Sequence, residues 1–331
     1  MEKDKKSRVE SQESRVKSPF LFVLLGPTAV GKTETALRLA QMLNTPIINA
    51  DSRQIYKDIP IGTAAPTAEQ QQLVRHYFVG TLALDDYYSA AEYERQVWEL
   101  LPTLYKERPY ALLTGGSMLY IDAVCNGIDD IPTVEPETRA MIRQRLKDEG
   151  LERLCAELRL LDPTYYAQAD LRNTQRIVHA LEICYQTGRA YSSFLTKGRE
   201  VQEFKSLRGS RVDIIKIGLY REREELFDRI NRRVVQMLEL GFEQEARRVY
   251  PLRHLNSLNT VGYKEIFRYF DGEWTLEQAV EKIQRNTRVY AKKQMTWFKR
   301  DEDIHWFHAN ETDKVLDFVK NRRSNTCLSG Y

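Results

Sequence analysis

The sequence predicts an α/β protein in which a parallel β-sheet core containing a P-loop has helices on both faces and is interrupted by an inserted, mainly helical domain. Three observations predict this fold class. Short apolar runs, typical of strands buried on both faces, alternate with segments of helical periodicity. A G-x-x-x-x-G-K-[ST] pattern follows the first run. About a hundred residues separate the third run from the fourth, far more than one crossover connection needs.

The elements follow one another in a regular order along the chain. The runs expected to form parallel strands are 20–25, 46–50, 110–113 and 212–219. Helices of the core are expected at 33–43, 89–106 and 221–241, and the last of these should stop at Gly241. Within the long insertion we expect helices at 135–149, 151–160 and 171–188.

This order predicts two folded parts and two tails. The α/β core would comprise 19–124 and 205–310, and the inserted helical domain 125–204. The charged segment 1–18 is expected to be a disordered tail, and 311–331 a C-terminal tail. The polar stretch 197–211 should be an irregular connection back to the sheet.

Composition narrows the class of protein. The chain has 331 residues, is 42% hydrophobic and carries a formal net charge of +3, as an ordinary globular protein does. Its first apolar run, 20–25, is too short for a signal sequence or a membrane span. Four scattered cysteines form no C-x-x-C pair and no zinc pattern. We therefore expect a cytoplasmic protein without membrane association, and a monomer is the default expectation.

The G-x-x-x-x-G-K-[ST] pattern lies between a strand and a helix, the context in which it forms a phosphate-binding loop. Its residues are Gly26, Pro27, Thr28, Ala29, Val30, Gly31, Lys32 and Thr33. Lys32 would reach the terminal phosphates and Thr33 would offer its hydroxyl to Mg²⁺. The pattern leaves the ligand open, because a diphosphate fits the same loop as a nucleoside triphosphate.

Two other strands end in polar residues at the same edge of the sheet. Asp51 and Ser52 follow the second strand, and Ser117 follows the third after two glycines. Since the carboxyl ends of parallel strands line the ligand crevice, we expect Asp51 to face the phosphate site. There it could act as a metal partner or as a general base, and the plainer alternative is that it caps a helix.

Several linked motifs resemble those of the tRNA dimethylallyltransferase family. They are "GPTAVGKT", "DSRQIYKDIPIGTAAP", "TGGSMLYIDAV", "RNTQRIVHALEI", "GLYREREELFDRINRRVVQMLELGFEQE", "NTVGYKE" and "TRVYAKKQMTWFKR". The resemblance spans about residues 21–306. It implies transfer of a dimethylallyl group from dimethylallyl diphosphate to the N6 amine of adenosine 37, beside the tRNA anticodon, with Mg²⁺ as the cofactor and diphosphate as the second product.

The resemblance also implies roles for individual residues. Thr28 and Lys32 would bind the diphosphate, Thr33 would support Mg²⁺, Arg233 would stabilise the leaving pyrophosphate, and Asp51 would take the proton of the amine. Positions that correspond to tRNA-contacting positions of the family are Asp51, Ser52, Arg53, Gln54, Ser117, Arg139, Gln175, Arg176, Ile177, Val178, His179, Asn259, Thr260, Val261, Gly262, Tyr263 and Lys264.

Two residues depart from the family pattern. Ser117 stands where the family usually has Thr, which keeps a hydroxyl and loses a methyl group. Ala65 stands where Lys is usual, so one positive charge is missing. Neither change removes a group that the chemistry requires.

A basic segment at 285–300 adds a signature of nucleic-acid binding. It contains six Lys or Arg residues, no acidic residue, and three interleaved aromatic residues. On a helix Arg285, Arg288 and Lys292 would share one stripe and contact phosphates of the tRNA anticodon stem-loop. The alternative is a solvated basic helix whose aromatic residues pack in the core. The Arg-rich inserted helices are expected to clamp the same stem-loop.

Two other classes of function share part of this pattern. A P-loop kinase for a small metabolite would use the same loop, Mg²⁺ and Asp51, but would not need the basic aromatic helix. A nucleotide-gated RNA-binding module would bind tRNA without turnover.

Overall fold

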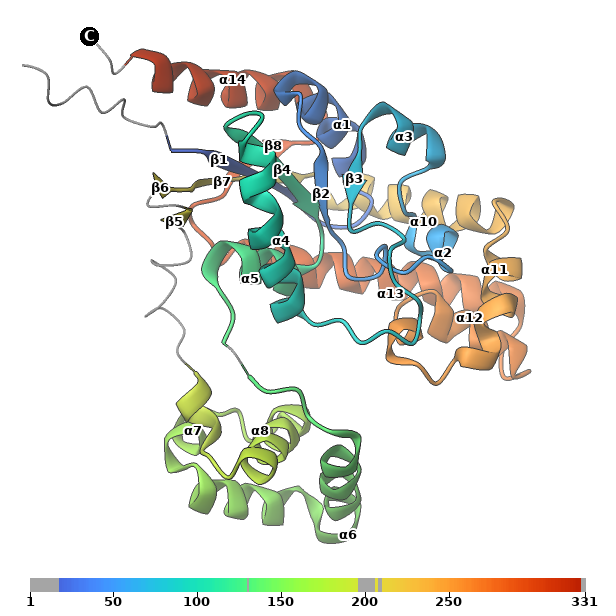
Figure 1. The fold of residues 1–331 in the computed structure, drawn as a ribbon. Helices are drawn as coiled ribbons and strands as arrows, with labels where there is room; N and C mark the ends of the chain where they lie inside the picture. Colours follow the sequence, from blue (N-terminus) through green and yellow to red (C-terminus); the bar gives the residue numbers. More distant parts are fainter. Residues whose placement is uncertain (1–17, 130, 196–205, 208–209, 329–331) are drawn as a thin grey trace, which may run out of the picture. The chain divides into compact units, whose positions relative to one another are not determined.

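The structure, a computed structural model, describes residues 18–129, 131–195, 206–207 and 210–328. Its centre is a six-stranded sheet with the order β3-β2-β4-β1-β7-β8, and every neighbouring pair is parallel (Figure 1). The strands are β1 (Phe20–Leu25), β2 (Ile47–Ala50), β3 (His76–Tyr77), β4 (Tyr110–Gly115), β7 (Asp213–Tyr220) and β8 (His305–His308). All four apolar runs are thus strands of one sheet, and β3 and β8 extend it at its edges.

Strand β1 lies inside the sheet and delivers the phosphate loop to its carboxyl edge. It pairs over its full length with β4 and with β7, so that Leu25 is level with both Gly115 and Gly218. Its five residues from Leu21 to Leu25 are all buried. An apolar strand without alternation is what burial on both faces requires.

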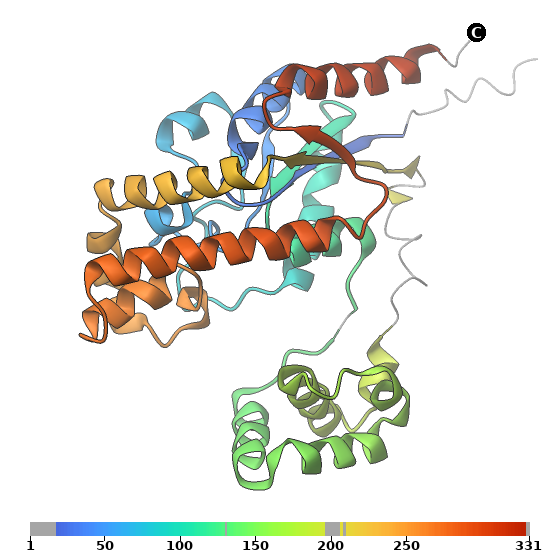
Figure 2. The same ribbon diagram turned by 180° about the vertical axis from the view of Figure 1, so that it is seen from behind.

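Helices cover both faces of the sheet, as the sequence predicts. One face packs against α4 (Ala90–Tyr105), α5 (Met118–Asn126) and the end of α13 (Leu276–Phe298). The other packs against α1 (Lys32–Leu43), α10 (Arg223–Glu239) and α14 (Thr312–Leu328), as the two opposite views show (Figures 1 and 2).

A third apolar cluster joins the late helices to the segment that follows β2. The elements concerned are α2 (Pro60–Thr63), α11 (Phe242–Val249), η2 (Tyr250–Leu252), η3 (Asn256–Leu258) and α12 (Tyr263–Phe270), whereas the short α3 (Ala68–Leu73) has no buried residue. Ile55 and Ile59 are buried there with Phe242 and Tyr263. This packing brings residues 51–64 beside α10, α11 and α12.

The expectation of a C-terminal tail at 311–331 is wrong for most of that segment. Helix α14 occupies 312–328, and its Val315 and Val319 are fully buried in the core cluster of α1. Arg38 of α1 also contacts Asp313 at 2.6 Å. Val315 and Val319 are four residues apart and so share one face of the helix, a spacing that is only a weak sign of packing in so charged a segment. The other expected tail, 1–18, lies almost entirely outside the described residues.

The inserted part forms a compact unit of its own, 126–204, one residue shorter than expected. Its elements are α6 (Pro136–Leu161), α7 (Pro163–Gln168), α8 (Thr174–Thr187) and η1 (Tyr191–Phe194). Gly150, with φ of 80°, breaks the helical geometry of α6, so that the two helices expected on either side of it form one bent element. Of the polar stretch 197–211, the described part is a short antiparallel pair, β5 (Ser206–Leu207) with β6 (Ser210–Arg211).

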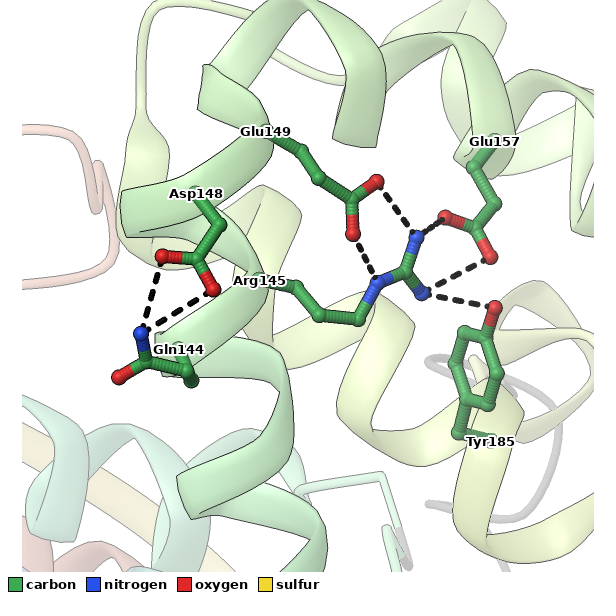
Figure 3. Close-up of polar contacts among 6 residues, drawn as sticks. All are labelled: Gln144, Arg145, Asp148, Glu149, Glu157 and Tyr185. Carbon is green, nitrogen blue, oxygen red and sulfur yellow. Dashed lines mark hydrogen bonds and ion pairs between the residues drawn. The ribbon is translucent and has the colours of Figure 1, made fainter.

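One arginine holds the bend of α6. Arg145 contacts Glu149 before the bend and Glu157 after it, each at 2.6 Å, and donates to the Tyr185 hydroxyl of α8 at 2.9 Å (Figure 3). Two carboxylates therefore neutralise this guanidinium. Although the inserted unit is rich in arginine, the charge of Arg145 serves its own fold.

None of the helices in the described part of the chain is both long and apolar enough to cross a membrane.

Candidate active site

A cleft of about 1560 Å³ opens at the carboxyl edge of the sheet, within the larger unit. Its walls are the phosphate loop, the ends of β2 and β4, and the inner faces of α10, α12 and α13. Lys32, Thr33, Asp51, Ser117 and Arg233 all line it. The strand-end residues and the loop residues expected to work together are therefore brought to one place.

The phosphate loop has a compact shape that its glycines permit. Gly26 has φ of 152°, and a Cβ there would lie 2.7 Å from the carbonyl oxygen of Leu219. Lys32 folds back across the loop and donates to the carbonyl oxygens of Gly26 and Pro27 at 3.0 and 2.8 Å. Burial lowers the pKa of Lys32 to about 8, Asp51 partly opposes this shift, and Arg233 adds to it.

Three arginines from the end of β7 and from α10 contact the loop. Arg229 Nε donates to the carbonyl of Ala29 at 2.9 Å, and Arg221 Nε donates to that of Val30 at 2.7 Å. Arg233 donates to the Thr28 hydroxyl at 3.1 Å. Ala29 has φ of 62°, an unusual value for a residue other than glycine, and the Arg229 contact holds it there.

These arginines are crowded and poorly hydrated. Burial lowers the pKa of Arg229, and the neighbouring Arg221 lowers it further. Burial also lowers the pKa of Arg233, which Asp51 partly offsets. Because each shift disfavours the charged form, an anion in the loop would lower the free energy of all these cations together.

The two carboxylate oxygens of Asp51 have different surroundings. Oδ1 accepts backbone N–H bonds from Arg53 at 2.9 Å and from Gln54 at 3.4 Å. These bonds close a turn, and no helix begins at Asp51, so it is not a helix cap. Within the described residues nothing donates to Oδ2. The carboxylate acts electrostatically on both Lys32 and Arg233, which places it beside the phosphate loop.

The hydroxyl of Ser117 is hydrogen-bonded within the protein, to Ser52. Its hydroxyl accepts the backbone N–H of Ser52 at 2.8 Å and lies 3.1 Å from the Ser52 hydroxyl. Only 7% of Ser117 is exposed. The residue lines the cleft, and its main effect is to tie the end of β4 to the end of β2.

Gln294 of α13 is a site residue that the sequence analysis missed. Its Nε2 donates to the carbonyl of Gly116 at 2.7 Å, and its Oε1 accepts the backbone N–H of Thr28 at 2.9 Å. It is 2% exposed. A glutamine three residues after Ala291 and four before Phe298 continues an apolar stripe, and this pattern was the available signal of a buried amide with partners.

The segments expected to contact tRNA mix exposed and buried side chains. Gln175, Arg176, Asn259 and Lys264 are exposed, Arg139 and His179 are half-buried, and Ile177, Val178, Gly262 and Tyr263 are buried. The Tyr263 hydroxyl donates to buried Glu245 at 2.5 Å, so this side chain supports the fold and is not available to RNA. Within these segments, the side chains of Ile177, Val178 and Tyr263 pack inside the protein, and the expected contact of the segments with tRNA stays a prediction.

Residues 52–54 and 259–261 all line the cleft. Arg53 donates to the carbonyls of Asn256 and Ser257, both at 3.0 Å. Gln54 donates to the carbonyls of Thr63 and Ala64. Ser52, Thr260 and Val261 are half-buried in the cleft wall. Arg139 and the segment 175–179 belong to the helical unit.

The three residues of the predicted basic stripe on α13 differ in their surroundings. Arg285 and Lys292 are exposed. Arg288 instead donates to Asn231 of α10 at 2.6 Å and lies over the ring of Phe227. The basic residue of this helix that lines the cleft is Lys293. It directly follows Lys292 and so lies about 100° around the helix from it, off the predicted stripe.

The oxygen atoms of the cleft suit a magnesium ion that arrives with a phosphate. The described residues hold no cluster of three His, Cys, Asp or Glu side chains for a metal. The exposed hydroxyl of Thr33 lines the cleft with Asp51 and Thr114. The Oγ1 of Thr114 is buried without a hydrogen-bond partner. Hard oxygen donors of this kind are what Mg²⁺ accepts when phosphates supply its other ligands.

Comparison with known proteins gives consistent results. The family model described as IPP transferase matches residues 54–301. The chain is 58% identical to the tRNA dimethylallyltransferase 1 of Bacteroides thetaiotaomicron, over 91% of this chain and 96% of that relative. It is 59% identical to the enzyme of that name from Phocaeicola vulgatus, over 90% and 97%.

Solved structures with this fold are also similar. The tRNA isopentenylpyrophosphate transferase of Bacillus halodurans has 31% identity and a TM-score of 0.67, with 94% of this chain and 98% of that one covered. A eukaryotic dimethylallyltransferase acting on tRNA has 24% identity and a TM-score of 0.77, with 93% and 80% covered. At that lower identity the likeness concerns the fold alone.

Proposed function

Since the chain belongs to the IPP transferase family, we propose that it transfers a dimethylallyl group from dimethylallyl diphosphate to the exocyclic N6 amine of the adenosine beside the anticodon of tRNA. The observation that carries the proposal is the contact of Arg221, Arg229 and Arg233 with a phosphate loop that faces one carboxylate, Asp51. Such a site suits departure of a diphosphate and deprotonation of a nucleophile.

The reaction requires stabilisation of the leaving diphosphate and deprotonation of the attacking amine. The bond between the allylic carbon and the diphosphate oxygen breaks, and a bond between that carbon and N6 forms. Negative charge gathers on the departing diphosphate, where Lys32 and Arg233 stabilise it. Because burial disfavours the charged forms of both cations, their interaction with an anion is strong.

The amine loses one proton in the same reaction, and Asp51 accepts it. Its Oδ1 is held by the N–H groups of Arg53 and Gln54, which fixes the carboxylate in place. Its Oδ2 is the oxygen that takes the proton. A carboxylate oriented by two backbone donors is a well-positioned general base.

Mg²⁺ is the proposed cofactor, held by the hydroxyl of Thr33 and by oxygens of the diphosphate. When bound, it would offset the charge of the leaving group. Lys32 and the three arginines orient the diphosphate in the loop, and Ser117 and Gln294 keep the strand ends and the loop in fixed positions.

The tRNA anticodon stem-loop is the proposed second partner. The target adenine has to leave its stack for its amine to reach Asp51 inside the cleft. Exposed Arg285, Lys292 and Lys293 on α13 supply phosphate contacts, and Arg139, Gln175 and Arg176 supply them from the helical unit. We propose that the protein works as a cytoplasmic monomer.

One assay tests the proposal against both alternatives. The protein is incubated with unmodified tRNA and Mg²⁺, and either dimethylallyl diphosphate or ATP, and the tRNA is digested to nucleosides for mass analysis. We expect dimethylallyladenosine and free pyrophosphate with the prenyl donor alone. Turnover that requires ATP would indicate a kinase. Binding of tRNA without any modified nucleoside would indicate a non-catalytic RNA-binding protein.

A further inference from the structure

Thr114, near the end of β4, carries a hydroxyl for which the protein provides no partner. Its Oγ1 is buried and makes no hydrogen bond. The residue is 9% exposed and lines the cleft. A buried hydroxyl without a partner destabilises a fold, so its presence calls for a ligand that supplies the bond.

The strand register shows which way this hydroxyl points. Thr114 is level with Leu24 of β1, and Leu112 is level with Phe22. Leu24, Phe22 and Leu112 all pack in the cluster that contains α1. Because residues two apart on a strand share a face, Thr114 points to the α1 side, one step nearer the carboxyl edge than Leu112. Ala36 and Thr33 of α1 line the cleft with it.

Many P-loop enzymes hold their metal ion with a carboxylate as well as the loop hydroxyl. In nucleotide hydrolases an aspartate and the loop Ser or Thr together hold Mg²⁺. Here the residues level with Leu24 on its two neighbours are Thr114 on β4 and Ile217 on β7. Neither carries charge, so the strands next to β1 offer the ion no carboxylate at this level. Asp51, which lines the same cleft from the end of β2, acts on Lys32 and Arg233, which leaves the diphosphate to supply the charge that holds the ion.

We propose that Thr114 is a further ligand-binding residue, whose hydroxyl accepts a hydrogen bond from a water molecule on the Mg²⁺ ion that accompanies the diphosphate. The inference rests on the proposed function, since a diphosphate has to occupy the loop. The proposal implies an order of binding, in which the diphosphate binds before the Mg²⁺ ion. The diphosphate supplies the charge that holds the ion, and Thr114 orients the hydration shell of the ion against α1.

Calorimetry with inorganic pyrophosphate tests this, with Mg²⁺ present or removed by a chelator. Thr114→Val keeps the shape and removes the hydroxyl. We expect it to weaken pyrophosphate binding about tenfold with Mg²⁺ and less than twofold without it, the loss of one hydrogen bond at a charged centre. Thr114→Ser restores the hydroxyl and should bind as the wild type does.

A matched control is Thr45→Val. Thr45 is also a buried threonine, but its hydroxyl donates to the carbonyl of Tyr110 at 3.1 Å. We expect this variant to lower the unfolding midpoint and leave pyrophosphate binding unchanged, whereas Thr114→Val should not lower the midpoint. Manganese titration of the wild type, followed by electron paramagnetic resonance, should show binding only after pyrophosphate is added.

Three results would overturn the inference. Equal pyrophosphate affinities of the wild type and Thr114→Val in Mg²⁺ would show that the hydroxyl contacts nothing in the complex. An equal loss with and without the ion would assign Thr114 to the phosphate itself. Tight manganese binding without pyrophosphate would contradict the order of binding. Failure of the wild type to bind pyrophosphate would instead overturn the proposed function.

Discussion

The side chain of Gln294 accepts a 2.9 Å hydrogen bond from the backbone N–H of Thr28. The same amide donates to Gly116, so that one residue of α13 joins the phosphate loop to the end of β4. The contact leaves no room for a larger residue, because a Cβ on Gly116 would lie 2.6 Å from Nε2. The helix with the basic surface thus also fixes the shape of the chemical site.

Replacing Gln294 by Leu should therefore affect both folding and substrate binding. It leaves the N–H of Thr28 and the carbonyl of Gly116 without partners, which should lower the free energy of unfolding by about 1–3 kcal/mol. Pyrophosphate binding should weaken as the loop loses its support. Urea unfolding and calorimetry measure the two effects. Gln284→Leu, on the same helix with one long contact to Asn231, is the control and should leave pyrophosphate binding unchanged.

Asp51→Asn should separate binding from chemistry. The amide oxygen can still accept the N–H groups of Arg53 and Gln54, so both substrates should bind normally. Single turnover should slow by about 10² to 10⁴, the usual range for a positioned base. If Asp51 acts mainly on the metal, the loss should shrink as Mg²⁺ is raised. Near-normal turnover at every Mg²⁺ concentration would exclude both roles.

Lys32 should give the protein a pH-dependent stability. Its pKa is about 8 in the folded chain against an ordinary value of 10.5. Between these pH values the unfolded chain holds a proton that the folded chain lacks, so the free energy of unfolding should rise with pH. Comparing wild type with Lys32→Met by urea unfolding across this window isolates the contribution. Parallel pH profiles for the two proteins would contradict the shift.

The basic residues of α13 should differ in their effect on tRNA binding. Neutralising Arg285 and Lys292, which are exposed, should lower the slope of log affinity against log salt by about 0.7 to 0.9 for each lost phosphate contact. Arg288→Gln should leave the slope unchanged and reduce stability, because Arg288 is bound to Asn231. Filter binding over a salt series measures this. If neutralising both Arg285 and Lys292 left the slope unaltered, this face of α13 would be a solvated surface that does not contact tRNA phosphates.

The sequence predicted those parts of the site that depend on local pattern. The loop from Gly26 to Thr33 is recognisable by itself, and Asp51 follows from its place after an apolar strand. Gln294 and Arg221 were missed because each acts through a partner 191 to 266 residues away. Hydrophobic periodicity shows that a helix has a buried face, but it does not show which loop that face covers.

The sequence also does not show which residues of a motif are buried. Tyr263 belongs to a segment with exposed Asn259 and Lys264, yet its ring lies inside the third cluster. Motif position alone does not distinguish a side chain that contacts RNA from one that supports it. For α14, apolar residues in a short charged segment were too few to predict packing without knowledge of the α1 surface that receives them.

The contacts of the phosphate loop also imply when the site is completed during synthesis of the chain. A nascent chain that ends before residue 205 already has the loop, Asp51 and Ser117, but lacks the three arginines and the glutamine that hold the loop. The inserted helical unit leaves the ribosome before them. We therefore expect a competent diphosphate site only after the last long helices emerge, so that truncated translation products cannot sequester the prenyl donor.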